Sequence, residues 1–248
     1  MGWLITLMGV SLTCFHLYTG YFGTLPSQQQ GAVHLGLALG MIFILFPATR
    51  GAGRRNGVPW YDVILAFVAT FAAYYKILFY EEVLRARVTG YSAVDLTIAA
   101  LGVLFVLEAT RRTVGMPIVV MATLAILYAL FGNLIPSPLL SHPGFSLEQV
   151  SPYLWFRESG VFGTPLQISA RFIFLFLFFG VVLMHTGVGR FFNDLAFALT
   201  GRFTGGAGKA AVIASSLQGM ISGSSIGNTV ASGSFTIPMM KMPASSPR

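Results

Sequence analysis

Residues 219–235 read GMISGSSIGNTVASGSF and contain four Gly and five Ser. Apolar runs lie on both sides, at 210–221 and at 226–240. At 1.5 Å per residue these runs give helices of about 18 and about 22 Å, and neither crosses a hydrocarbon core of about 30 Å. The pattern therefore predicts a re-entrant helical hairpin, which enters the membrane from one side and turns back at residues 222–225.

The predicted turn has the chemistry of an ion or substrate site. Non-helical backbone at membrane depth is tolerated only where protein buries it or where it lines a cavity, because each free amide and carbonyl needs a partner. Carbonyl oxygens and Ser hydroxyls at a helix break suit Na⁺, and the amide end of a half helix favours an anionic group. The alternative is a continuous, Gly-rich seventh span that packs against its neighbours through small residues.

The composition of the whole chain is that of an integral membrane protein. Hydrophobic residues make up 55% of it and charged residues only 9%, whereas soluble domains carry about 25% charged residues. The net charge of +7 comes from Lys and Arg in short clusters between apolar runs, which is typical of loops in the cytoplasm. We therefore expect membrane lipid around the chain and no nucleic acid as a partner.

Six apolar segments are long enough, or nearly so, to span a membrane. They lie at 3–22, 32–48, 60–80, 92–109, 114–135 and 166–187. The loops after the second, fourth and sixth segments hold eight Lys and Arg, and the other loops hold three. The six segments predict a multi-pass, all-α protein. Because basic residues are retained in the cytoplasm, the count of Lys and Arg predicts a cytoplasmic N-terminus.

Two segments outside the spans are amphipathic. The loop at 136–165 contains FSLEQVSPYLWFRESGVFG, which we expect on the outer membrane interface. After the sixth span, Phe191, Leu195 and Leu199 recur at helical spacing beside Arg190 and Asp194. This pattern predicts a helix on the cytoplasmic interface, parallel to the membrane, just before the hairpin.

The isolated polar residues of the spans are explained without chemistry. His16 and His34 are expected to form hydrogen bonds between packed helices, and Lys76 to extend toward the outer interface. For Arg171, one turn into the sixth span, either an interface position or a contact with a partner segment is open. Acidic residues near span ends are expected to be solvated by lipid headgroups; these are Asp62, Asp95 and Glu108.

No enzyme motif survives inspection. Residues 223–227 match the G-x-S-x-G signature of serine hydrolases, but the last acid and the last histidine, Asp194 and His185, precede it, whereas both should follow it. The run TGGAGKA is like a phosphate-binding loop, yet Phe203 and Ala210 stand where that motif needs Gly and Ser or Thr. The lone Cys14 and four scattered His predict neither a disulfide framework nor a metal site.

Residues 211–241, AVIASSLQGMISGSSIGNTVASGSFTIPMMK, resemble the first hairpin of the large membrane subunit of TRAP transporters, the tripartite ATP-independent periplasmic solute importers. Residues 174–216 resemble the preceding helix, interfacial segment and hairpin entry of fused TRAP permeases, especially the TAXI-associated branch. The resemblance is specific over about 165–241. Upstream, the run SLTCFHLYTGYFG and the spans to about 135 resemble, more weakly, the small-subunit part of such fusions.

The resemblance implies a helical inverted-repeat elevator in the bacterial inner membrane. It further implies Na⁺ as coupling ion, no other cofactor, an organic-acid substrate and a TAXI-like periplasmic solute-binding protein as partner. The matching positions place ion and substrate at Ser222, Gly223, Ser224, Ser225 and Asn228, with Gly233 and Pro238 shaping the second arm. In place of the family's usual Ala before the Asn, this chain has Gly227.

The expected organisation follows from these assignments. It comprises small-subunit-like helices at 1–135, the extracytoplasmic loop at 136–165, a span and interfacial helix at 166–204, the hairpin at 205–241 and an aberrant tail at 242–248. The family continues beyond this point with a second hairpin, of which the chain holds no copy. We therefore expect the N-terminal part of a permease, with the remaining half as a partner; the alternative is a non-transporting membrane scaffold or assembly subunit.

Overall fold

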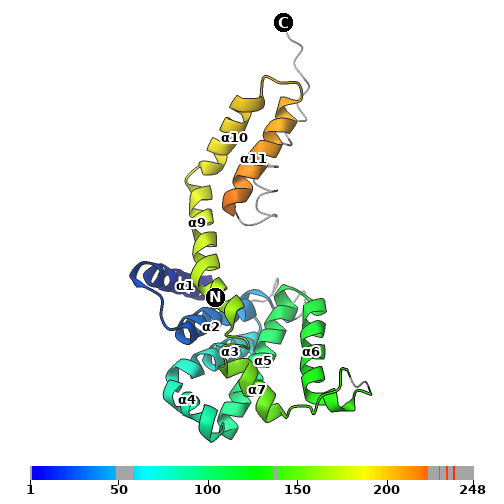
Figure 1. Cartoon of the computed structure of the whole chain (residues 1–248). Coiled ribbons are helices and arrows are strands. Elements are labelled where there is room, and N and C mark those ends of the chain that lie inside the picture. Colours follow the sequence, from blue (N-terminus) through cyan, green and yellow to red (C-terminus); the bar gives the residue numbers. More distant parts are fainter. Residues whose placement is uncertain are drawn as a thin grey trace. The chain divides into compact units, whose positions relative to one another are not determined.

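The computed structural model describes residues 2–48, 58–136 and 139–222, together with residues 229, 233 and 237. Throughout these ranges the regular structure is helical (Figure 1). The chain divides into two compact units, Met1–Phe172 and Ile173–Arg248. An all-α fold is therefore confirmed.

Six stretches are long and apolar enough to span a membrane, as the sequence predicted. Five of them lie in unit 1, and the sixth, Thr164–Leu183, runs through the unit boundary. The elements of unit 1 are α1 (Gly2–Phe22), α2 (Ser27–Leu45), α3 (Trp60–Leu78), α4 (Tyr80–Thr89), α5 (Ala93–Thr113), α6 (Met116–Phe131), η1 (Gly132–Leu134), α7 (Leu147–Phe156) and α8 (Thr164–Ile168). A π-helical segment, η2 (Ser169–Ile173), follows α8.

The helix boundaries follow local sequence signals. Ser92 and Asp95 form a capping box at the start of α5, in which each side chain accepts a hydrogen bond from the other residue's backbone N–H. Gly115, at a φ of 115°, and then Pro117 separate α5 from α6. Such a φ strongly favours glycine, so the chain turns sharply between these two spans.

Small residues let α2 and α3 pack closely in the core of unit 1. Ala66, Ala69 and Ala73 of α3 are buried, and the Thr70 hydroxyl donates to the Gly36 carbonyl of α2 at 3.0 Å. A Cβ placed on Gly36 would lie 3.1 Å from the Tyr74 ring. Close backbone approach through small residues is the usual way in which helices associate in lipid.

α7 is the amphipathic helix expected in the fifth loop, but its aromatic face is buried. Trp155 is fully buried, and its indole N–H donates to the Ala72 carbonyl of α3 at 3.3 Å. The indole lies against Gly102, at the middle of α5, and a Cβ on Gly102 would overlap it. The buried face fixes α7 to α3 and α5, and the expected position of this segment on the outer interface stays a prediction.

α4 is a short helix, not predicted from the sequence, in the connection between α3 and α5. Glu81 and Glu82 lie in its first turn and Arg87 in its last turn, an order that favours the helix dipole. Val83 and Ala86 are buried against the rest of unit 1. The acidic-to-basic order around two apolar residues was the signal for this helix.

Unit 2 contains α9 (Phe174–His185), α10 (Val188–Thr200) and α11 (Gly206–Ser222). α10 and α11 lie side by side (Figure 1) around buried Ala196, Ala210 and Ala214. Phe191 and Leu199 of α10 are 60% and 52% exposed. This exposed apolar stripe fits the predicted interfacial helix.

Candidate functional site

The predicted tip of the hairpin lies at the edge of what the structure describes. Gly223, Ser224, Ser225 and Asn228 fall outside the described residues, as does Pro238. Ser222 is the last residue of α11, and Gly233 is helical, as are Thr229 and Ile237. The structure therefore gives the first arm of the predicted site and leaves its tip as a prediction.

The first arm is held against α10 by buried amides. Gln218, one turn before Ser222, donates from Nε2 to the Gly189 carbonyl and to Oδ1 of Asn193, both at 3.4 Å. Gln218 and Asn193 are 8% and 4% exposed. Oε1 of Gln218 is buried without a partner among the described residues. Sequence analysis missed Gln218; a lone amide in an Ala- and Ile-rich arm was the available signal.

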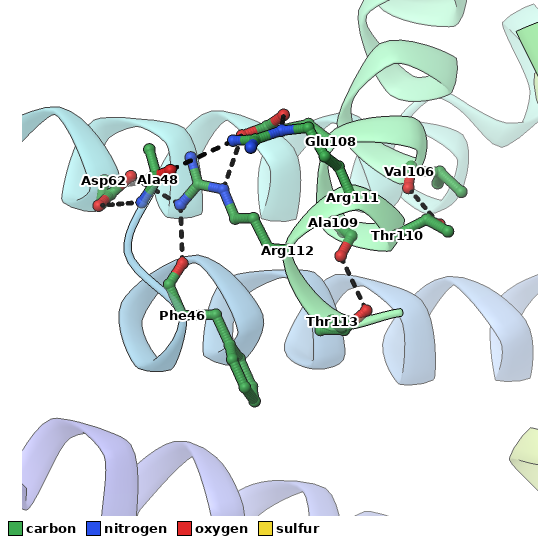
Figure 2. Close-up of polar contacts among 10 residues, drawn as sticks. All are labelled: Phe46, Ala48, Asp62, Val106, Glu108, Ala109, Thr110, Arg111, Arg112 and Thr113. Carbon is green, nitrogen blue, oxygen red and sulfur yellow. Dashed lines mark hydrogen bonds and ion pairs between the residues drawn. The ribbon is translucent and has the colours of Figure 1, made fainter. Parts of the chain in front are cut away.

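A second polar group, drawn in Figure 2, joins the ends of three spans. Arg112, near the end of α5, donates to Asp62 Oδ1 at 2.7 Å and to the Phe46 carbonyl at 3.0 Å. Its Nε also donates to Glu108 at 2.7 Å. Only 2% of the Arg112 side chain and none of that of Asp62 is exposed. The expectation that headgroups solvate Asp62 is thus wrong, because a guanidinium neutralises it inside the protein.

The ion pairs of this cluster hold the ends of the spans together. Glu108 also accepts from Arg111 at 2.7 Å, and Asp62 Oδ2 accepts from the Ala48 amide at 3.4 Å. Both carboxylates therefore already have cationic partners and offer little to a further cation. Removing one partner from a buried ion pair leaves an uncompensated charge at a cost of about 3–5 kcal/mol.

A third polar group connects α1 and α2 to the π-helical segment η2. His34 Nδ1 lies 2.9 Å from His16 Nε2, and His34 Nε2 lies 3.2 Å from the Ser169 hydroxyl. His16 Nδ1 lies 2.8 Å from the Leu12 carbonyl. A carbonyl only accepts, so His16 Nδ1 carries hydrogen and, with both rings neutral, the donors run from Ser169 through His34 to His16. The expected role of the two histidines in helix packing is confirmed.

Gln30 completes this third group. Its Nε2 donates to the Thr19 hydroxyl at 3.1 Å and to the Ala170 carbonyl at 3.3 Å. A π turn has i to i+5 bonds in place of the regular i to i+4 bonds, and the Ala170 carbonyl within it accepts this bond from outside the helix. Arg171 donates to the Ser27 hydroxyl at 2.9 Å. Arg171 therefore contacts the first turn of α2. This helix begins at Ser27, five residues before the predicted span, and it includes the buried Gln30.

Lys76 does not extend to the interface, contrary to the expectation. It is 1% exposed, and its Nζ lies 4.2 Å from the centre of the Phe162 ring. Among the described residues Nζ has no hydrogen-bond partner. Phe162, which covers the ammonium group, comes from the loop after α7.

Metal ligands are not gathered anywhere in the described ranges: no group of three or more His, Cys, Asp or Glu side chains is placed to hold an ion. The predicted ion site rests on the Gly- and Ser-rich tip, which does not depend on such ligands.

Comparison with known protein families gives a match over more than half of the chain. The model of the family described as "Tripartite ATP-independent periplasmic transporter, DctM component" matches residues 101–244. The match begins within α5 and includes α9, α10, α11 and the Gly- and Ser-rich stretch at 219–235. Neither a curated protein nor a solved structure matches the chain.

Proposed function

The chain belongs to the DctM family of tripartite ATP-independent periplasmic transporters, and on that premise we propose that it is a permease component of a Na⁺-coupled importer of organic acids. It is a transport protein of a multi-pass inner-membrane family, not a member of an enzyme family. The family implies a periplasmic binding protein that delivers the solute. We further propose that this partner is of the TAXI type and that the N-terminus is cytoplasmic.

The observation that carries the proposal is the family match, which includes the Gly- and Ser-rich stretch at 219–235. We propose that the first arm ends at the start of this stretch, so that the carbonyl end of α11 meets the Gly- and Ser-rich residues. The carbonyl end of a helix is its negative pole and favours a cation. Together with the hydroxyls of Ser224 and Ser225, these carbonyls form the all-oxygen environment that Na⁺ requires.

The second arm would hold the substrate. We assign its first turn to the residues after the break, with Asn228 beside the organic acid and Gly233 leaving room for close helix packing. The amide end of a helix favours a carboxylate. Adjacent sites of opposite sign let the ion and the anionic solute stabilise each other, which is the physical basis of coupling.

Hydrogen exchange of the purified chain in lipid nanodiscs tests the proposal. We expect residues 222–228 to gain protection in Na⁺ over K⁺ at equal ionic strength, because a bound ion restrains the turn. Residues 190–200 of α10 serve as the internal control and should not respond. Equal exchange in both salts would favour the alternative, a non-transporting scaffold that uses the hairpin for packing.

The matched variants are Ser224→Ala with Ser225→Ala, and Ser216→Ala as control. Ser216 lies on the same arm, and its hydroxyl is exposed and donates to the Val212 carbonyl at 2.9 Å. Loss of the Na⁺ response in the first pair, with the response kept in Ser216→Ala, would locate the effect at the tip. The same loss in Ser216→Ala would indicate a general change in the arm.

A further inference from the structure

A groove lies in unit 1 between α4, α6 and α7. Its volume is about 830 Å³. α4, Tyr91 and the end of α7 come together at the groove. In the sequence, α4 and Tyr91 lie between the end of α3 and the start of α5. None of the three polar groups described above lines it. Its size falls in the range of roughly 300–1,000 Å³ that is typical of small-molecule sites.

The polar side of the groove presents hydrogen-bond donors. Arg87 and Tyr91 both line it. Arg157 also lines the groove, with its guanidinium 6.0 Å from the centre of the Tyr153 ring. An arginine only donates, so a group that bonds to Arg87 and Arg157 from the groove must be an acceptor.

The charge of the groove is positive. Arg87 and Arg157 outweigh the single carboxylate of Glu148, so a negative acceptor is preferred over a neutral one. A phosphate group has the oxygens to accept from two guanidinium groups and a phenol at once, and arginine recognises it by paired bonds. The ligand therefore has an anionic, oxygen-rich head.

The opposite wall of the groove is apolar and continues along a membrane span. Ala125, Ile126 and Ala129 form this wall, and they belong to α6, which has no fully buried residue. Only 6% of the span Met116–Leu134 is buried within the protein. A tail that leaves the groove along α6 thus meets a surface already suited to acyl chains.

From these features we infer that the groove binds one anionic phospholipid, with its phosphate held by Arg87, Arg157 and Tyr91 and its acyl chains along α6. The lipid would fill the space beneath α4 and α7 and fasten these short helices to the membrane span. This inference does not depend on Na⁺ coupling or on the transported solute.

Native mass spectrometry of the chain in detergent tests the inference, with phosphatidylglycerol as probe and phosphatidylcholine for comparison. We expect one phosphatidylglycerol to remain bound at high collision energy, and the Arg87→Gln, Arg157→Gln double variant to bind it at least about tenfold more weakly, since hydrogen bonds to charged groups are the stronger ones. Arg85→Gln is the matched control. It removes the same charge from an exposed position of α4 that does not line the groove.

Arg87 also donates to the Phe156 carbonyl at 3.0 Å, so its loss affects the packing of α4 as well. Arg157→Gln and Tyr91→Phe, which keep that bond, test binding without it, and each should weaken retention severalfold. Retention equal to wild type in the double variant and in these two would overturn the inference. So would equal retention of phosphatidylcholine, or weakening of the same size in Arg85→Gln. If a protein partner occupied the groove instead, the variants would retain phosphatidylglycerol as well as the wild type does.

Discussion

Arg112 of α5 donates to Asp62 of α3 over 2.7 Å, with 2% of the arginine side chain and none of the aspartate side chain exposed. The same guanidinium donates to the Phe46 carbonyl just after α2 and lies 4.7 Å from the centre of the Phe43 ring. One side chain thus ties together the ends of three spans. The pair is isolated from solvent, and the charge of Asp62 is compensated there by Arg112.

We predict that Arg112→Gln lowers the free energy of unfolding by about 3–5 kcal/mol, because it leaves the Asp62 carboxylate buried without its cationic partner. Thermal or denaturant unfolding in detergent measures the change. Arg111→Gln is the control, since the Arg111 side chain is 37% exposed in its pair with Glu108 and should cost at most about 1 kcal/mol. Equal losses for both variants would contradict a special role of the buried pair.

Gly102→Ala should destabilise unit 1 by about 1–3 kcal/mol, because the added methyl group would overlap the buried Trp155 indole and force α7 away. Gly9→Ala, in the middle of α1, has open space around the new Cβ and should stabilise by up to about 1 kcal/mol through helix propensity. Unfolding midpoints and Trp fluorescence check both variants. A neutral Gly102→Ala would mean that α7 does not pack in the core as described.

Gln30→Leu should destabilise by about 1–3 kcal/mol, because the Ala170 carbonyl in the π turn and the Thr19 hydroxyl lose their donor. Hydrogen exchange is expected to rise in residues 169–173. Gln28→Leu is the control, because the Gln28 bond to Glu158 is exposed. Unchanged exchange at 169–173 in the Gln30 variant would show that the π turn is maintained without this bond.

Lys76→Met should be neutral or stabilising, because it removes a buried ammonium whose described contact is the Phe162 ring and leaves an apolar chain of similar length. The unfolding midpoint in detergent is the measurement. A lower midpoint in Lys76→Met would contradict this prediction. If added anions lower the midpoint of the wild type in the same way, Lys76 has an anionic partner.

The spans were predictable because they depend on length and hydropathy, and local polar residues change only their ends. The start of α2 was missed because Ser27-Gln-Gln-Gln30 has the composition of a loop. Gln30 becomes helical through two long-range acceptors, Thr19 and Ala170, which no local pattern contains. Lys76 was misplaced for the same reason, since the Phe162 ring that covers it comes from a distant loop.

Part of the candidate site was also predictable from the sequence, and part of it was not. The amphipathic character of α10 follows from its own sequence, and the structure agrees with it. α11 begins at Gly206, four residues before the predicted arm. The pairing of Gln218 with Asn193 required the two helices to be brought together first. The chemistry of the tip, Gly223 to Ser225 and Asn228, remains a prediction from sequence and family.

Direct binding of radioactive sodium to the purified chain tests most directly whether the hairpin holds a Na⁺ site. We predict saturable binding that K⁺ does not displace, that Ser224→Ala with Ser225→Ala abolishes and that Ser216→Ala retains. Absence of saturable binding in a folded wild-type protein, or equal binding in the tip variant, would contradict the assignment of the Gly- and Ser-rich hairpin as the Na⁺ site.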